Sequence, residues 1–283
     1  MITLASDFGS PYPAAMRGVV HRRTTGGVQV SDVAHDLPRQ DPRAAAFWLR
    51  FVLPEYPPAT HCVVVDPGVG TDRAALVVRA GDHVLVGPDN GVLLPPARAL
   101  AASAAGGGER AADDAVPTAN LDVYEIAVDD PASATFHGRD VFAPTAADVH
   151  EVGVDALGTL DALSPTDSSV DLRFPSPTVE SDGDGLGTRA TGEVLVVDDF
   201  GNAITNVPGS FLDDRLGESV TVTAPDRVTT APAVETFAAV APGDPLVTVG
   251  SHGYVECDVN EGRGEEAFGL ASGDPVTLAF GLN

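Results

Sequence analysis

A short loop after an apolar run carries residues whose types and spacing suggest ligand chemistry. Residues 63–73 read VVVDPGVGTDR, and Gly68 and Gly70 are spaced like the first two glycines of the dinucleotide fingerprint G-x-G-x-x-G. Arg73 stands where the third glycine would let helix and strand pack closely around pyrophosphate. Asp66 opens the loop with a negative charge that repels phosphate, and the next segment alternates like a strand. The loop therefore favours a cationic or hydroxyl-bearing ligand over a phosphate.

Other polar and ionisable residues stand at comparable positions, at the ends of apolar runs or just before a helix. They are Asp7, Asp89, Asn90, His137, Arg139, Asp140, Asp198 and Asn202. Because ligands of open α/β sheets bind at strand ends, the pattern predicts an α/β enzyme with an acidic site. Structural alternatives stay open: an aspartate that caps a turn, a core histidine bonded to backbone, ordinary Asp–Arg pairs, or a divalent metal among the Asp and His side chains.

The elements that must position these residues alternate between strand and helix in the first part of the chain. Apolar runs predict strands over 2–7, 27–34, 61–66, 74–80, 83–89 and 121–128, and helical spacing predicts helices over 41–56 and 140–153. The Ala- and Gly-rich stretch 102–115 is interpreted as a helix end plus a surface loop. This order predicts an α/β domain over residues 1–165 with a central, mostly parallel sheet.

The texture of the chain changes after this first domain. Pro, Ser, Asp and Gly dominate residues 166–188, which we interpret as a linker. Short β-like runs separated by turn signals follow, at 192–201, 219–224, 245–250, 253–260 and 274–282. With little helical pattern between them, these runs predict a small all-β barrel or sandwich over residues 189–283.

Composition excludes several classes of function. The 283 residues carry a formal net charge of -25, and all 16 basic residues are Arg, with no Lys. Such a chain repels nucleic acid and anionic membranes, and we interpret the evenly spread acid as a solvated surface suited to a salt-rich cytoplasm, typical of a halophilic protein. The missing Lys excludes a P-loop, a protein-kinase lysine and a Schiff base.

The two cysteines and the lengths of the apolar runs indicate the cellular compartment of the protein. Cys62 and Cys257 both stand in alternating apolar runs and are predicted to be small buried hydrophobes rather than zinc ligands. No apolar run approaches the ~20 residues of a membrane span, and the chain enters a strand pattern without a basic-then-apolar leader. These features favour a cytoplasmic protein.

Seven stretches, in order along nearly the whole chain, carry a family resemblance. They are ITLASDFG, SDVAHDLPRQD, VVVDPGVGTDRAALVV, VGPDNGVL, TFHGRDVFAP, DDFGNAITN and GSHGYVECDVNEG. Together they resemble the S-adenosylmethionine (SAM) hydrolases, also called SAM hydroxide adenosyltransferases, of the fluorinase/chlorinase superfamily. The resemblance implies an N-terminal α/β domain, a smaller C-terminal β-barrel, and a homotrimer that holds the ligand between one subunit's N-terminal domain and a neighbour's C-terminal domain.

The resemblance also implies a reaction and a catalytic set. Water or hydroxide attacks C5′ of the ribose of SAM and displaces the methionine sulfur, giving adenosine and L-methionine without a metal or a second cofactor. The family's hydrolytic residues fall on Asp66, Arg73 and His137. Halogenases of the superfamily have another residue in place of Asp66 and Tyr-Ser or Tyr-Gly in place of His137-Gly138, so the chain is similar to the hydrolase branch.

Binding roles follow from the same resemblance. Asp7 and Asp66 are expected near the ribose, Asn202 at the adenine, and Asp198 and Ser251 at the methionine ammonium and carboxylate. The C-terminal segment expected to meet adenine contributes Tyr254, Glu256, Val259 and Glu261. A SAM-dependent halogenase, a non-catalytic adenosine or SAM-binding protein and a metal-dependent phosphoesterase stay as alternatives.

Overall fold

The computed structural model describes residues 1–104, 121–128, 131–181 and 187–281. The chain divides into two compact units, Met1–Arg173 and Phe174–Asn283. The division falls inside the segment 166–188 that we interpret as a linker, and the first strand of the second unit begins within that segment as well.

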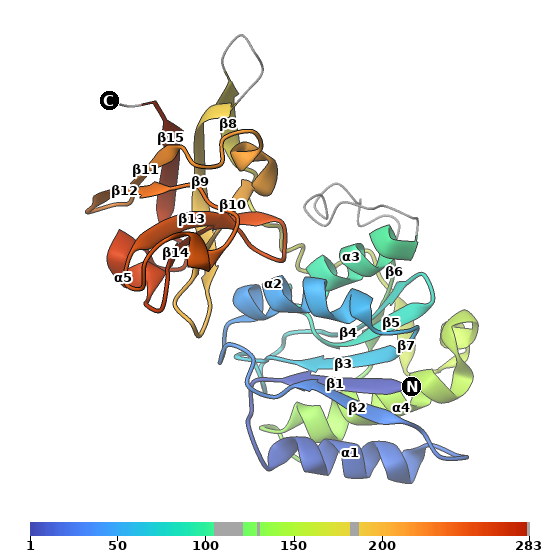
Figure 1. The fold of residues 1–283 in the computed structure, drawn as a ribbon. Coiled ribbons are helices and arrows are strands. Elements are labelled where there is room, and N and C mark those ends of the chain that lie inside the picture. The colour runs from blue at the N-terminus through green and yellow to red at the C-terminus, as the bar shows by residue number, and fades with distance from the viewer. Residues whose placement is uncertain (105–120, 129–130, 182–186, 282–283) are drawn as a thin grey trace. The chain divides into compact units, whose positions relative to one another are not determined.

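The N-terminal unit is built on a seven-stranded sheet with the order β2-β1-β3-β5-β4-β6-β7 (Figure 1). Its strands are β1 Ile2–Ser6, β2 Val30–Ala34, β3 Thr60–Val64, β4 Ala75–Ala80, β5 His83–Pro88, β6 Asp122–Ile126 and β7 Leu163–Pro165. The four strands β2, β1, β3 and β5 run parallel to one another, and β4, β6 and β7 continue the sheet in antiparallel pairs. The predicted α/β domain is confirmed, with a parallel core and an antiparallel extension.

Helices cover both faces of this sheet, with α2 and α3 on one face and α1 and α4 on the other (Figure 1). The helical elements are α1 Tyr12–Arg23, α2 Pro42–Val52, α3 Leu94–Ala104, α4 Ala143–Val152, the 3₁₀ turns η1 Leu53–Glu55 and η5 Val154–Thr159, and the π-helical turn η4 Gly138–Phe142. The core between the sheet and α1/α4 includes Ile2, Leu4, Met16 and Val64. Its apolar side chains fix the strand ends that carry the polar residues.

Local sequence explains where two of the predicted helices differ from the observed ones. Asp41 is the N-cap of α2, and its carboxylate accepts the Ala44 amide at 3.0 Å. The α-helical part ends at Val52, before Pro54, which has no amide hydrogen to donate. The predicted helix 140–153 is preceded by the π-helical turn that starts at Gly138. In the stretch 102–115, α3 ends at Ala104 and the remainder lies outside the described residues.

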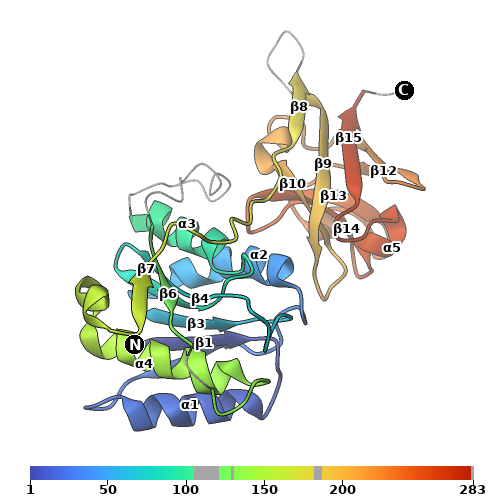
Figure 2. The same ribbon diagram turned by 180° about the vertical axis from the view of Figure 1, so that it is seen from behind.

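The C-terminal unit is an antiparallel barrel whose order is β12-β11-β15-β9-β10-β14-β13, with β8 paired to β9. Its strands are β8 Thr178–Ser181, β9 Gly187–Val197, β10 Ala203–Pro208, β11 Ser219–Thr223, β12 Val228–Pro232, β13 Pro245–Val249, β14 Tyr254–Val259 and β15 Pro275–Phe280, with short helices η6 Gly209–Leu212, η7 Phe237–Ala239 and α5 Gly264–Phe268. Figure 2 shows the long strand β9 beside β15. One isolated parallel bridge between Ala233 and Val247 brings the two ends of the order together, so the unit is a nearly closed barrel.

Both cysteines lie in the two hydrophobic cores, as predicted. Cys62 on β3 and Cys257 on β14 are free thiols with no exposed surface. Burial raises the pKa of Cys62 to about 12, and burial together with the neighbouring carboxylates raises the pKa of Cys257 well above its ordinary value. Among the described residues, no helix is long and apolar enough to cross a membrane.

Candidate active site

Two carboxylates meet at the carboxyl edge of the parallel core. Asp7 directly follows β1, and Asp66 comes two residues after the end of β3. Strands β1 and β3 are parallel neighbours in which Ser6 lies opposite Val64, so the two aspartates leave the sheet side by side. Both line one cavity of about 540 Å³.

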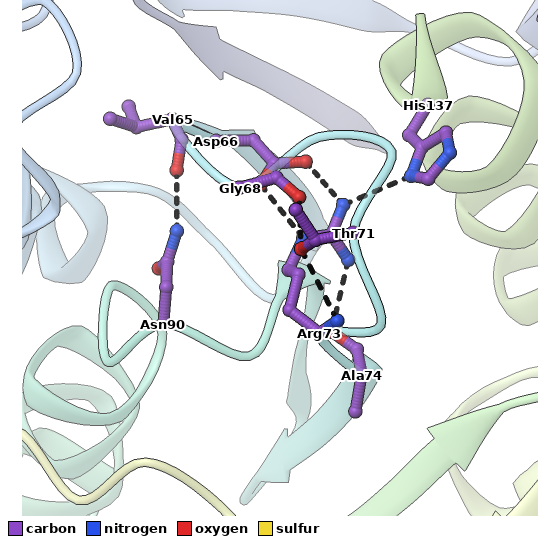
Figure 3. A network of polar contacts seen from close by, with 8 residues as sticks. All are labelled: Val65, Asp66, Gly68, Thr71, Arg73, Ala74, Asn90 and His137. Atoms are coloured by element: carbon purple, nitrogen blue, oxygen red, sulfur yellow. Dashed lines mark hydrogen bonds and ion pairs between the residues drawn. The ribbon is translucent and has the colours of Figure 1, made fainter. Parts of the chain in front are cut away.

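Arg73 clamps Asp66 at this edge (Figure 3). Its Nε donates to Asp66 Oδ1 at 2.7 Å, its Nη2 donates to Asp66 Oδ2, and its Nη1 donates to the Ala74 carbonyl at 3.0 Å. The guanidinium also lies over the Phe142 ring, 5.1 Å from the ring centroid. Only 11% of the Arg73 side chain and 4% of the Asp66 side chain are exposed, so this planar, two-point ion pair is held in a mostly dry setting.

The loop of residues 66–73, which contains Gly68 and Gly70, allows the Asp66–Arg73 ion pair to form. Gly70 has a φ of +79°, and a Cβ there would lie 2.7 Å from the Ala134 carbonyl oxygen. The Thr71 hydroxyl donates to the Gly68 carbonyl at 2.7 Å, and Asn90 donates to the Val65 carbonyl at 2.8 Å. The glycine therefore allows residues 66–73 to turn back on themselves and to approach the segment that carries His137.

His137 completes a three-residue network across the loop. Arg73 Nη2 lies 3.1 Å from His137 Nδ1, and a guanidinium can only donate. We therefore assign the Nδ1 lone pair as the acceptor and place the ring proton of neutral His137 on Nε2. Burial and then the Arg73 charge lower the pKa of His137, against the opposing charges of Asp66 and Asp140, so the neutral form persists at neutral pH.

The cavity combines carboxylates, aromatic rings and two arginines. Its lining residues are Asp7, Phe8, Tyr12, Arg39, Gln40, Asp66, Val69, Ser133, Thr135, Phe136 and Arg139. The backbone N–H of Gln40 donates to Asp7 Oδ2 at 2.7 Å, which fixes that carboxylate at the wall. Arg139 is bound to Asp140 by two hydrogen bonds of 2.6 and 2.8 Å. Such a site can hold a polyhydroxylated, positively charged ligand beside a polar network able to orient water.

Sequence reasoning missed the aromatic part of this wall. Phe8 and Phe136 lie next to predicted site residues, and Tyr12 starts the first helix, but nothing in their spacing predicted that they share one cavity. Asp89, by contrast, accepts the Val170 amide at 2.7 Å and takes a structural role. Among the described residues, no group of three or more His, Cys, Asp or Glu side chains is arranged to hold a metal ion.

The remaining predicted residues lie in the C-terminal unit. Asp198 Oδ1 accepts the Asn202 and Phe200 amides at 2.9 Å, and Asn202 Nδ2 donates to Asp198 Oδ2 at 3.0 Å. These bonds close the tight turn from β9 to β10 and tie the two predicted residues together. The turn thus presents Asp198 and Asn202 as one rigid polar group.

The other five predicted binding residues lie on β14 or in the turns beside it, in different environments. Tyr254, Glu256 and Val259 are buried on the strand, whereas Ser251 and Glu261 are exposed in the flanking turns. Glu256 Oε1 lies 2.6 Å from His252 Nε2, so its carboxylate already has a partner within the barrel. The segment therefore divides into a buried strand and two exposed turns.

Comparison with known proteins covers both units. Residues 2–158 match the SAM hydroxide adenosyltransferase N-terminal domain, and residues 192–277 match the corresponding C-terminal domain. The chain is similar to solved structures from Thermotoga maritima, an uncharacterised conserved protein, and from Thermus thermophilus, a conserved hypothetical protein. The first has a TM-score of 0.78 and 28% identity over 99% of this chain and 100% of that one, and the second 0.68 and 34% over 98% of each.

Similarity to curated proteins extends over the full length. An (R)-S-adenosyl-L-methionine hydrolase of Salinispora tropica is 42% identical over 99% of this chain and 98% of its own length. One of the same name from Thermus thermophilus is 40% identical over 96% of this chain and 97% of its own length. With both domains matched in order, the chain belongs to the SAM hydroxide adenosyltransferase family.

Proposed function

We propose that this protein hydrolyses (R)-S-adenosyl-L-methionine to adenosine and L-methionine. The observation that carries the proposal is the network in which Arg73 joins Asp66 to His137, because Asp66 lines the same cavity as Asp7. The names of the full-length relatives supply the substrate and its sulfonium configuration. A protein that only bound adenosine would have no physical need for a clamped carboxylate beside a neutral histidine.

The chemistry asks mainly for a well-placed water. Attack at the sp³ carbon C5′ requires the nucleophile in line with the C–S bond, and the sulfonium departs as a neutral thioether. Fixing that geometry can supply up to about 7–11 kcal/mol of the barrier in ideal cases. As the oxygen bonds to C5′ and the C–S bond breaks, Asp66 accepts the proton that the water loses, and the Arg73 guanidinium stabilises the hydroxide character that the oxygen gains as this proton leaves.

His137 is best suited to hold the water rather than to remove its proton. Its Nδ1 already accepts from Arg73, so neutral His137 offers the Nε2 hydrogen to the water oxygen. To act as the base at Nδ1, the ring would first have to give up the Arg73 contact. We therefore assign Asp66 as the group that orients the water and accepts its hydrogen.

The remaining contacts are proposed from family membership. Asp7 has one oxygen on the Gln40 amide and lines the cavity, so it can accept from the ribose hydroxyls. The rigid Asp198–Asn202 turn is proposed to meet methionine and adenine of a ligand bound to a neighbouring copy in a homotrimer. Light scattering should then give a mass of three times the 29.0 kDa chain.

The reaction is tested in ¹⁸O-labelled water with a chelator present. Adenosine that carries the label and is absent with Asp66→Ala would support water attack and the role of Asp66. Chlorinated adenosine formed in chloride would place the protein among the halogenases. Loss of activity with chelator would favour a metal enzyme, and tight adenosine binding without any product would leave a binding protein.

A further inference from the structure

Three aromatic rings meet in the wall of the cavity, and we call Phe8, Tyr12 and Phe136 the aromatic corner. Their ring centroids are 6.3 Å apart for Phe8–Tyr12, 6.0 Å for Phe8–Phe136 and 5.3 Å for Tyr12–Phe136. The interplanar angles are 74°, 85° and 83°, so each ring is nearly perpendicular to the other two. The three rings come from separate segments, after β1, at the start of α1 and before η4.

The backbone leaves room for this arrangement at Gly138. A Cβ on Gly138 would lie 3.2 Å from the Phe136 ring, 3.3 Å from the Phe8 ring and 3.2 Å from the Met16 sulfur. A side chain there would be crowded against both rings and would require them to shift. Tyr12 is nevertheless 54% exposed, so its ring contributes little to the core and remains open to a ligand.

The charges around the corner do not by themselves select a cation. The Asp66 carboxylate is paired with Arg73, and Arg139 is paired with Asp140. Ring faces attract cations through their quadrupole, and this attraction does not require a net negative pocket. The Arg139 guanidinium lies over one face of Phe136, 5.2 Å from the ring centroid, so a bound cation would meet the other face of that ring.

We propose that the aromatic corner recognises the sulfonium cation of the substrate and so distinguishes SAM from neutral thioethers. The inference rests on the proposed function. The sulfonium sulfur is bonded to C5′, so it must lie one bond from the carbon that the water attacks. Phe136 is adjacent to His137, Phe8 is adjacent to Asp7, and both rings line the cavity that Asp66 lines, which places them near the proposed hydrolytic and ribose-binding residues.

The geometry of the rings favours a compact cation over the flat adenine base. A flat base held between two rings needs parallel ring faces, and the three nearly perpendicular rings provide no such slot. The neutral methionine product would lose the cation–π attraction and leave more readily. Because the positive charge declines as the C–S bond breaks, the rings stabilise bound substrate at least as much as the transition state.

The test compares ligands with and without the charge. Steady-state kinetics give KM and kcat for SAM, and competitive inhibition by S-adenosyl-L-homocysteine, the neutral thioether, gives an affinity without the cation. For Tyr12→Leu and Phe136→Leu we expect the KM for SAM to rise about 3- to 10-fold while the thioether constant changes less than about twofold. We expect kcat to stay within about twofold, because the lost attraction acts mainly on bound substrate.

Two further variants sharpen the result. Tyr12→Phe keeps the ring and should keep the ratio of the two constants, and Phe237→Leu, a partly exposed ring on η7, should change neither. Equal weakening of both ligands, or no change in either, would overturn the inference. If the wild type made no adenosine, the proposed function would fail, and calorimetric dissociation constants for the two ligands would decide the inference alone.

Discussion

At the scale of single residues, Arg73 links the groups of the candidate site. One guanidinium serves the Asp66 carboxylate, the Ala74 carbonyl and the His137 ring, and it rests on the face of Phe142. This division is possible because guanidinium is planar, always charged and rich in donors. A different cation at position 73 would keep the charge but lose the geometry.

Arg73→Lys should therefore separate charge from geometry. We expect kcat to fall about 100-fold, the order found when one charge-stabilising donor is removed from an active site, with little change in KM. Arg79→Lys is the matched control, since Arg79 pairs with Asp155 on the surface, and it should keep activity within about twofold. Full activity of Arg73→Lys would show that the fork is dispensable.

The pH dependence of the reaction should report His137. Burial and the Arg73 charge lower its pKa, so the neutral ring that accepts from Arg73 is retained below pH 6.5. We expect the acid limb of the kcat/KM profile to lie below pH 6.5, because protonation removes the Nδ1 acceptor. In Arg73→Met the acid limb of the kcat/KM profile should move to higher pH or disappear. An NMR titration of the wild-type His137 ring that gives a pKa above 6.5 would contradict the assignment.

The sequence predicted some residues of this site but not its aromatic wall or the tautomer of His137, for a physical reason. Asp7, Asp66, Arg73 and His137 were selected by their places after apolar runs and by the family motifs, and the structure brings all four to one edge. The aromatic corner and the tautomer of His137 depend on distances between residues far apart in the chain. Such distances are set by packing, which one-dimensional spacing does not encode.

At the scale of elements, the parallel core must be tight for the strand ends to meet. Gly87 on β5 lies so close to β3 that a methyl group there would collide with the Val63 carbonyl oxygen. Val63 lies three residues before Asp66, so the close approach of β5 helps to fix where the loop of residues 66–73 leaves the sheet. Glycine here serves close approach and not a positive φ.

Gly87→Ala should consequently destabilise the N-terminal unit. We expect a loss of about 1–3 kcal/mol in the free energy of unfolding, the usual range for overpacking a core. Gly158→Ala is the control, because a Cβ at Gly158 would have no neighbour within 4 Å. Urea unfolding of both variants measures the difference, and an unchanged midpoint for Gly87→Ala would mean that the strands can separate at no cost.

Strand β14 carries a second element-scale prediction. Asp258 is fully buried there, and burial followed by the neighbouring Glu256 carboxylate raises its pKa to about 9. The folded state then holds a proton that the unfolded chain releases near pH 4, so this group makes stability decline as pH rises from about 4 to about 9. Asp258→Asn, a neutral mimic of the protonated side chain, should flatten that decline in urea unfolding measured across this pH range. A wild type and variant with parallel curves would show that Asp258 is ionised in the fold.

The elements themselves were predicted unevenly. The strands of the parallel core and the barrel runs follow from apolar patterning, because burial on a sheet imposes it. Short elements such as β7, β8 and the π-helical turn η4 were not predicted. They arise from pairing with a neighbour or from packing at the start of a helix, so they have no pattern of their own long enough to detect.

At the scale of the whole molecule, the net negative charge is expected to make the stability of the fold depend on salt. A net charge of -25 with only 16 arginines leaves most carboxylates without a basic partner, and their repulsion acts against the compact state. Such repulsion reaches about 10 Å at 0.1 M salt and about 3 Å at 1 M. We therefore expect the free energy of unfolding to increase with ionic strength.

The melting temperature should rise as NaCl increases from about 0.05 to about 0.5 M, because the screening length shortens about threefold over this range. A variant with Asp36→Asn, Asp161→Asn and Asp226→Asn removes three exposed carboxylates and should melt higher at low salt, with a smaller dependence on salt. The comparison isolates charge, since salt effects on apolar surface are common to both proteins. Equal salt dependence in the two proteins would assign the effect to hydration, and a melting temperature that rose as salt was removed would refute the repulsion argument.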